Sequence, residues 1–227
     1  MQLGIKKSIL IVDDDKDILM FLSYNLRKEG YRIFTATDGE EAIAQVKKIQ
    51  PSLILLDVMM PVLDGIEACR LIRSMRLNEQ PIIAMLTARS EEYSEIAGFE
   101  AGADDYINKP IRPRLLIKKI ESLLRRNYNL TNTISQSEEH GISINREKYS
   151  ASKDGHEISL TKKEFELMEL FVSNTGKVFG RQQILSLLWD EDTIVGERTV
   201  DVHIRKLRER FGNEIIRTIK GVGYLMP

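Results

Sequence analysis

Short apolar runs alternate with amphipathic segments of helix length over the first half of the chain. The runs are SILIVD, YRIFTA, SLILLD, PIIAML and DYIN, at residues 8–13, 31–36, 52–57, 81–86 and 105–108. Stretches such as ILIV and LILL lack polar alternation, which is typical of strands buried on both faces. The spacing leaves room for one helix between successive runs. The pattern predicts an α/β fold, a doubly wound five-stranded parallel sheet covered by helices.

The pattern changes after residue 126. The stretch 127–139 is polar, lacks strong periodicity and predicts a linker. Beyond it lie three short strand candidates, three helical stretches and a terminal hairpin candidate, EIIRTIKGVGYLMP, with Gly221 and Gly223 near its turn. We therefore predict one domain over 1–126, a linker over 127–139 and a smaller α+β domain over 140–227.

Composition narrows the classes of function. The 227 residues include 33 basic and 34 acidic side chains, a net charge of -1, so any DNA-binding face must be local. The single cysteine, Cys69, excludes an internal disulfide and a Cys-rich zinc module, and the three histidines lack zinc-ligand spacing. No apolar run approaches the ~20 residues of a membrane span. We expect a soluble cytoplasmic protein with no membrane partner.

Chemically active residues follow several of the predicted strands. Asp13 and Asp14 come after the first run, Asp57 ends the third, Thr87 follows the fourth and Lys109 follows the fifth. Binding sites in open parallel sheets lie at the carboxyl ends of the strands. Clustered carboxylates suit a hard cation such as Mg²⁺, and one of them can then attack a phosphoryl donor. The residues indicate an aspartyl-phosphate site, although acids after strands also serve as plain helix caps.

Four motifs in order, ILIVDDD, LLDVMMPVLDG, LTAR and GADDYINKP, resemble the receiver domain of bacterial two-component response regulators over about residues 6–126. The resemblance implies the strand order 2-1-3-4-5 and a cis Lys109-Pro110 bond. It also implies the following roles: Asp57 as phosphoacceptor; Asp13, Asp14, Asp57 and the Met59 backbone carbonyl as Mg²⁺ ligands; Thr87 and Lys109 as phosphoryl-binding residues; Thr87 and Tyr106 as switch residues.

The basic residues of the second domain gather near its end. Residues 198–220 hold seven bases and three acids. Within RTVDVHIRKLRERFG, the apolar residues Val200, Ile204, Leu207 and Phe211 recur every three to four positions and predict a helix with one buried stripe. Its opposite face suits the DNA major groove, and a solvated charged helix is the alternative. The hairpin that follows looks like a wing with Lys220 at its tip.

The order of elements, together with SLTKKEFELMELFVSNTGKVFGRQQILSLLW, RTVDVHIRKLR and IKGVGY, resembles the winged-helix effector domain of the OmpR/PhoB class over about residues 140–227. The resemblance implies that the third helix enters the major groove and the wing the minor groove. Trp189 is expected to be a core residue, and the loop 190–197 is a candidate contact for RNA polymerase. The candidate DNA-binding residues are Arg198, Val202, His203, Arg205, Lys206, Arg208, Arg217 and Lys220.

Together the two resemblances imply a phosphorylation-regulated DNA-binding transcriptional regulator of a two-component system, not an enzyme. A sensor histidine kinase would phosphorylate Asp57 and so promote receiver dimerisation and binding to double-stranded DNA. One alternative is an atypical regulator independent of phosphorylation, which the intact acidic and phosphoryl-binding residues disfavour. The other is an aspartyl-nucleophile phosphohydrolase, which is disfavoured because Met59 stands where that class commonly has an acid.

The predicted homodimer departs from its class. Dimers of the class usually pair a base in the fourth receiver helix with an acid in the fifth, but Glu95 and Leu115 stand at those positions. That salt bridge cannot form, so we expect a partly hydrophobic interface. The alternative is a monomeric receiver, with DNA alone joining two copies. The candidate interface residues are Glu95, Ile96, Phe99, Asp104, Asp105, Leu115, Lys119 and Arg126.

Overall fold

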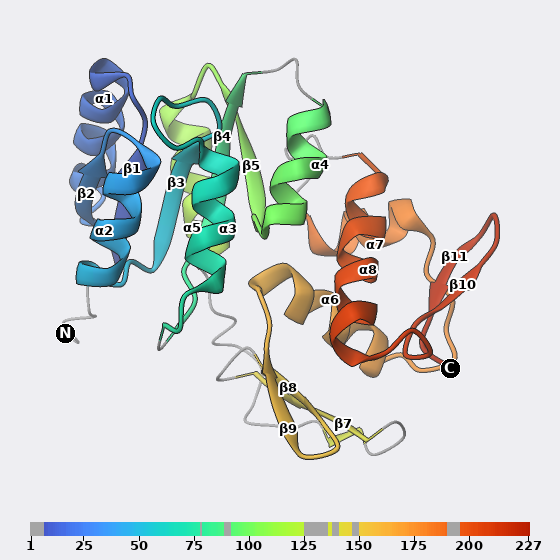
Figure 1. Ribbon diagram of the computed structural model, residues 1–227. Helices are drawn as coiled ribbons and strands as arrows, with labels where there is room; N and C mark the ends of the chain where they lie inside the picture. Colours follow the sequence, from blue (N-terminus) through green and yellow to red (C-terminus); the bar gives the residue numbers. More distant parts are fainter. Residues whose placement is uncertain are drawn as a thin grey trace, which may run out of the picture. The chain divides into compact units, whose positions relative to one another are not determined.

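A computed structural model of the protein describes residues 7–77, 79–88, 92–124, 136–137, 141–146, 150–189 and 196–227. The chain divides into two compact units, residues 1–128 and 129–227, and each is described here by itself (Figure 1). The expected linker, 127–139, lies outside the described residues except for a two-residue strand, β6 (Gln136–Ser137).

The first unit is a five-stranded parallel sheet in the order β2-β1-β3-β4-β5, which confirms the predicted class and strand order. Helices alternate with the strands along the chain (Figure 1). The strands are β1 (Ser8–Val12), β2 (Arg32–Ala36), β3 (Leu53–Asp57), β4 (Ile82–Ala88) and β5 (Asp105–Lys109). The helices are α1 (Lys16–Lys28), α2 (Gly39–Ile49), α3 (Gly65–Ser74), α4 (Glu92–Ala101) and α5 (Pro113–Leu124).

Local signals explain where these helices begin and end. The side chains of Asp15, Asp38 and Asp64 each accept a hydrogen bond from a backbone N–H in the first turn of α1, α2 and α3. Such caps satisfy donors that the helix itself leaves unpaired, and replacing one by alanine costs about 1 kcal/mol. The α4 helix ends at Ala101, and the next residue, Gly102, has a φ of +110° that turns the chain back toward β5.

The core of the first unit explains the unbroken apolar runs. All five residues of β3 are buried, because helices cover both faces of the central strand. On one face, Leu22 of α1 and Ile120 of α5 pack with Leu55 and Leu86 of the sheet. By the alternation of strands, Met85, Thr87 and Tyr106 project to the other face. That face lies toward α3 and α4.

Over its described residues, the second unit combines an antiparallel sheet, three helices and a hairpin. The sheet holds β6, β7 (Ile142–Asn145), β8 (Ser150–Lys153) and β9 (His156–Ser159). The helices are α6 (Lys162–Val172), α7 (Arg181–Leu188) and α8 (Arg198–Phe211), and the hairpin strands are β10 (Arg217–Ile219) and β11 (Gly223–Leu225). Trp189 is buried with the core, as expected. None of the described helices in either unit is long and apolar enough to cross a membrane.

Candidate phosphoacceptor site and DNA interface

The predicted acidic residues meet at one edge of the parallel sheet. Asp13 directly follows β1, Asp57 ends β3 and Lys109 ends β5. The Lys109 Nζ atom lies 2.8 Å from Asp13 Oδ2 and 2.8 Å from Asp57 Oδ1. Asp13 and Asp57 are buried, whereas Asp14 is exposed at the rim. Thr87 is also buried and sits near the end of β4, next to β3. The structure thus brings together the residues that the strand-end pattern singled out.

The electrostatics of the site are dominated by burial and by Lys109. Burial raises the pKa of Asp57, the hydrogen bond and charge of Lys109 oppose the shift, and Asp13 and Asp14 add to it. Burial alone would lower the pKa of Lys109, but its bonds to Asp13 and Asp57 outweigh burial and leave that pKa raised. The ammonium therefore stays charged at neutral pH and balances one of the crowded carboxylates.

The residues present fit a magnesium ion. One carboxylate oxygen from each of Asp13, Asp14 and Asp57 lies within 4.8 Å of the others. An all-oxygen set on an exposed rim suits Mg²⁺, which keeps several waters and takes one or two carboxylates. The role of the Met59 backbone carbonyl stays a prediction; its side chain is 68% exposed beside this site.

One contributor to the site went unpredicted. A Cβ atom at Gly65 would lie 1.9 Å from the backbone oxygen of Asp57, so only glycine lets the start of α3 approach the end of β3 so closely. The motif VLDG contains this glycine. The Asp-Gly pair in the motif indicates a turn, but the motif does not indicate that Gly65 lies against the backbone of Asp57. The Lys109-Pro110 bond is cis, as the resemblance implied.

The proposed switch residue Tyr106 is buried in the first unit. It lies on β5 opposite Met85 of β4, and its ring packs on Phe99 of α4 with centroids 4.7 Å apart. Thr87 lies two residues beyond Met85 on the same face of the sheet. The two predicted switch residues therefore occupy one face, one strand apart.

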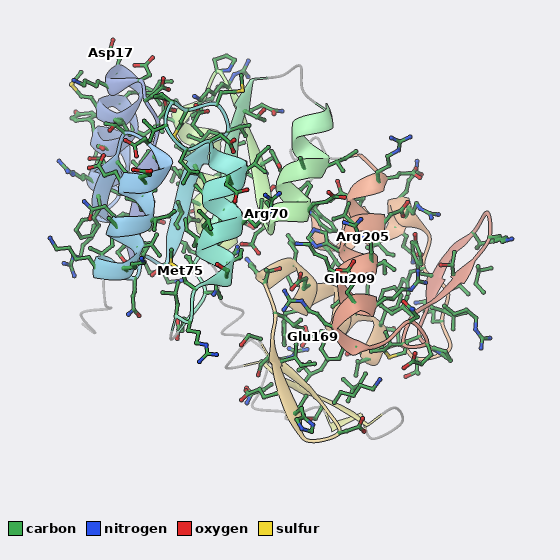
Figure 2. All side chains as sticks on the ribbon, viewed as in Figure 1. Asp17, Arg70, Met75, Glu169, Arg205 and Glu209 are labelled. Carbon is green, nitrogen blue, oxygen red and sulfur yellow. The ribbon has the colours of Figure 1, made fainter. Side chains whose placement is uncertain are left out.

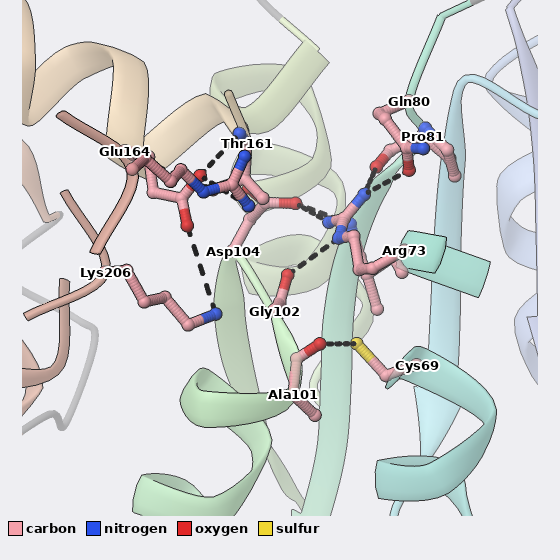
Figure 3. A network of polar contacts seen from close by, with 12 residues as sticks. Cys69, Arg73, Gln80, Pro81, Ala101, Gly102, Asp104, Thr161, Glu164 and Lys206 are labelled. Atoms are coloured by element: carbon pink, nitrogen blue, oxygen red, sulfur yellow. Dashed lines mark hydrogen bonds and ion pairs between the residues drawn. The ribbon is translucent and has the colours of Figure 1, made fainter. Parts of the chain in front are cut away.

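Several residues predicted for the dimer have partners within their own chain. Asp104 is fully buried and pairs with Arg73 of α3 at 2.6 Å (Figure 3). Arg73 also donates to the backbone oxygens of Gly102 and Pro81, so it joins the ends of α3 and α4 to the start of β4. Asp105 pairs with Lys119 of α5 at 3.0 Å. These contacts stabilise the fold of the first unit.

The remaining dimer candidates differ in how far they are exposed to solvent. Leu115 on α5 is 46% exposed, Ile96 is half-buried and Phe99 is fully buried. The side chain of Glu95 and all of Arg126 lie outside the described residues.

Helix α8 has the predicted buried stripe, but its other face is less exposed than expected. Val200, Ile204, Leu207 and Phe211 are buried, as predicted. Val202, expected on the opposite surface, and His203, expected to flank that surface, are also buried, and the His203 ring lies 5.5 Å from the ring of Trp189. Burial lowers the pKa of His203 to about 3, aided by the charges of Lys206 and Lys163. In this structure His203 is therefore neutral and packed.

Two predicted DNA-binding bases also make internal contacts. The Lys206 Nζ atom lies 3.9 Å from the buried carboxylate of Glu164 at the start of α6 (Figure 3). Arg208 donates to the backbone oxygen of Ile216 and to Thr218, which lie before and within β10. Both residues fasten α8 to its neighbours.

The exposed bases of the predicted DNA-binding set lie on α8 and the wing. Arg205 pairs loosely with Glu209 one turn later, at 3.7 Å (Figure 2). The exposed members of the predicted set are Arg198, Arg205, Arg217 and Lys220. Lys220 lies in the turn between β10 and β11, as predicted. The loop considered for RNA polymerase lies outside the described residues except for 196–197.

A further polar network, unpredicted, joins α7, α8 and the wing. Arg181 donates to Asp201 Oδ1 at 2.7 Å and to the Tyr224 hydroxyl at 2.8 Å, and that hydroxyl donates to Asp201 at 2.6 Å. Burial and the bond to Asp201 raise the pKa of Tyr224 to about 12, so the hydroxyl keeps its proton. The three residues fix β11 against the first turn of α8.

Comparisons with known proteins agree with both units. The family model for the response regulator receiver domain matches residues 9–121, and that for the C-terminal domain of transcriptional regulatory proteins matches residues 155–226. Response regulator DrrB of Thermotoga maritima, an OmpR/PhoB homologue, is 33% identical, with 98% of this chain and 99% of DrrB covered and a TM-score of 0.51. A RitR mutant is 26% identical, with 97% and 99% covered and a TM-score of 0.72. A two-component response regulator from Clostridium difficile is 32% identical, with 53% and 98% covered and a TM-score of 0.50.

Proposed function

Because the chain belongs to the OmpR/PhoB family of two-component response regulators, we propose that phosphorylation of Asp57 controls its binding to DNA. The observation that carries this proposal is the setting of Asp57. Its carboxylate ends the central strand, 2.8 Å from the Lys109 ammonium and beside the acid pair Asp13 and Asp14. A carboxylate so placed has both a cation to balance charge and an open rim from which a donor can approach.

In the proposed transfer, an Asp57 oxygen attacks the phosphorus of a phosphohistidine on a sensor kinase. The new O–P bond forms as the P–N bond breaks, and the imidazole nitrogen keeps the bonding electrons and then takes a proton from water. Asp13, Asp14 and Asp57 would hold Mg²⁺, which supplies charge neutralisation on the phosphoryl oxygens. Lys109 pairs with one phosphoryl oxygen, and the Thr87 hydroxyl donates to another.

The proposed consequence is a change at Tyr106 and then at the surface formed by α4, β5 and α5. Thr87 moves toward the phosphoryl group, and Tyr106 follows on the same face of the sheet. Two receivers then associate, and their effector domains bind adjacent half-sites about one DNA turn apart. The exposed bases of α8 and the wing, Arg198, Arg205, Arg217 and Lys220, are proposed to contact the DNA.

The test is phosphorylation with acetyl phosphate and Mg²⁺, followed by intact-mass measurement. We expect wild-type protein to gain one phosphoryl group and Asp57→Asn to gain none, because Asp57 is the one acid of the cluster that ends the central strand, β3, between the acid pair after β1 and Lys109 of β5. Asp64→Asn is the matched control: it keeps the cap of α3, since asparagine also caps helices, and should be labelled normally. Phosphorylated wild-type protein should also bind DNA selected from a random pool more tightly than Asp57→Asn does.

Two results would contradict this function. One is labelling that persists in Asp57→Asn or in the presence of a metal chelator. The other is equal DNA affinity of labelled and unlabelled protein, which would instead favour the atypical regulator that acts without phosphorylation.

A further inference from the structure

A glycine stands in the interior of α4, where a side chain is expected. Gly98 lies between Ala97 and Phe99 and is buried. Glycine is among the least favourable residues in a helix interior, because it loses the most backbone freedom on folding. Its φ is not positive, so the local backbone does not require it. The reason for a glycine at this position must lie in what packs against it.

The space above Gly98 is taken by Tyr106. A Cβ atom at position 98 would lie 1.8 Å from the Tyr106 hydroxyl oxygen and 3.0 Å from Cζ of the same ring. Met85 of β4 forms another wall, with its Cε atom 3.6 Å away, and the Phe99 ring packs on Tyr106. The phenol end therefore rests directly on the helix backbone, and any side chain at position 98 overlaps the hydroxyl.

Neither backbone is free to withdraw. The Gly98 carbonyl accepts hydrogen bonds from the N–H groups of Gly102 and Ala103, at 3.0 and 2.9 Å, which close the end of α4. Tyr106 belongs to β5 and is paired in register with Met85 of β4. If a methyl group appeared at position 98, the least costly response is rotation of the Tyr106 side chain away from α4.

We propose that Gly98 positions the side chain of the switch residue Tyr106. Because position 98 has no side chain, the Tyr106 hydroxyl can reach its buried place on α4, and residue 98 sets the balance between a buried and a displaced tyrosine. Gly98 is thus a positioning residue that acts through Tyr106. This inference deepens the proposed function, since Tyr106 is the residue through which Thr87 acts on the α4, β5 and α5 surface.

The test is a double-mutant cycle in the full chain, made from Gly98→Ala and Tyr106→Phe. The Tyr106 ring resonance is observed by NMR with ¹³C-labelled tyrosine and assigned by its absence in Tyr106→Phe. We expect Gly98→Ala to shift this resonance toward that of solvent-exposed tyrosine and to lower the thermal midpoint by several degrees. In the Tyr106→Phe background the overlap with the hydroxyl is absent and the contacts with Cζ, at 3.0 Å, and with Met85 Cε, at 3.6 Å, remain, so we expect Gly98→Ala to lower the midpoint much less or not at all. Ala97→Gly is the matched control, because it exchanges the same two residue types, and so the same helix propensity, at the neighbouring position of α4.

The outcomes distinguish a role of Gly98 in positioning Tyr106 from a general requirement for glycine at this position of α4. An unmoved Tyr106 resonance in Gly98→Ala, or equal destabilisation or loss of folding in both backgrounds, would overturn the proposal. A shift of equal size in Ala97→Gly would also overturn it. These measurements use unphosphorylated protein. In a separate measurement, a wild-type Tyr106 resonance that does not change when acetyl phosphate and Mg²⁺ are added would count against the proposed function. It would leave the positioning role of Gly98 intact.

Discussion

At the scale of single residues, one position beside the proposed phosphoacceptor site carries backbone strain. Val62 has a φ of +69°, and its side chain is 77% exposed in the loop between β3 and α3. Left-handed backbone is uncommon for any residue other than glycine, and for a β-branched residue it is an outlier. Strain of this kind costs on the order of 1 to 3 kcal/mol. The surrounding turn, which ends at the Asp64 cap, holds Val62 in place.

Replacing Val62 by glycine should therefore stabilise the receiver. We expect the free energy of unfolding to rise by about 1 kcal/mol, because relief of strain exceeds the added backbone entropy of glycine in the unfolded chain. Denaturant unfolding followed by circular dichroism measures the change. Val62→Ala, which keeps a Cβ atom, is the control and should gain less. A lower unfolding free energy for Val62→Gly would show that the exposed valine makes a stabilising contact.

At the scale of elements, the wing depends on a second close approach of backbones. Phe179, in the turn between α6 and α7, exchanges two hydrogen bonds with Tyr224 of β11, at 2.8 and 3.0 Å. A Cβ atom at Gly223 would lie 2.0 Å from the Phe179 backbone oxygen. The wing is thus attached both through this bridge and through the Tyr224 hydroxyl. Gly223 makes the bridge sterically feasible.

Gly223→Ala should detach the wing. The two lost hydrogen bonds contribute about 1 kcal/mol each, so we expect the effector unit to lose about 2 kcal/mol or more of stability. Lys220 would leave its place in the turn. The slope of the logarithm of the DNA-binding constant against the logarithm of the salt concentration should then become shallower by roughly one unit. Thermal unfolding and fluorescence anisotropy over a salt series measure the two effects.

Gly180→Ala is the matched control for the wing. It lies at the same junction, has a φ of -71° and meets its nearest neighbour, the Val222 oxygen, at an ordinary 3.5 Å. Its DNA binding should stay near wild type. A Gly223→Ala protein with an unchanged salt slope would mean that Lys220 does not contact a DNA phosphate.

At the scale of the whole molecule, the ion pairs within the receiver bear on the predicted dimer. Asp104 and Asp105 are paired with Arg73 and Lys119 of the same chain. If Asp104 and Asp105 formed ion pairs across a dimer interface, these intrachain contacts would have to break. An exposed ion pair across the interface would stabilise the dimer by only about 0 to 1 kcal/mol. Leu115 offers apolar area instead, and burying such a side chain contributes roughly 1.5 to 3 kcal/mol.

Leu115→Glu should therefore weaken association of the phosphorylated protein at least tenfold, about 1.4 kcal/mol. Sedimentation equilibrium of the full chain, with acetyl phosphate and Mg²⁺, measures the dimer dissociation constant. For the wild-type protein this constant should change little when moderate salt is added. Leu71→Glu on α3 is the control, because that leucine is 39% exposed on a different helix. A phosphorylated wild-type protein that stays monomeric at high concentration, or stronger association of Leu115→Glu, would refute the hydrophobic interface.

Local patterns in the sequence were sufficient for the main elements and for the residues of the proposed phosphoacceptor site. The unbroken apolar run of β3 follows from burial on both faces, and Asp38 and Asp64 cap helices as their positions indicate. The site was also predictable, because parallel strands end at one edge of the sheet. Residues that end a strand, such as Lys109, or directly follow one, such as Asp13, must then gather there. Periodicity likewise gave the buried stripe of α8.

Only the tertiary structure decided which charged and small residues are used internally. Arg73 and Asp104 are 31 positions apart, and Arg181 and Tyr224 are 43 apart. Periodicity reports which face of its own helix a residue occupies, but not which distant group arrives at that face. Gly98 shows the same limit: its sequence context is that of a weak helix position, whereas the Tyr106 hydroxyl that occupies the space beside it comes from strand β5. Packing between distant segments therefore decided these roles.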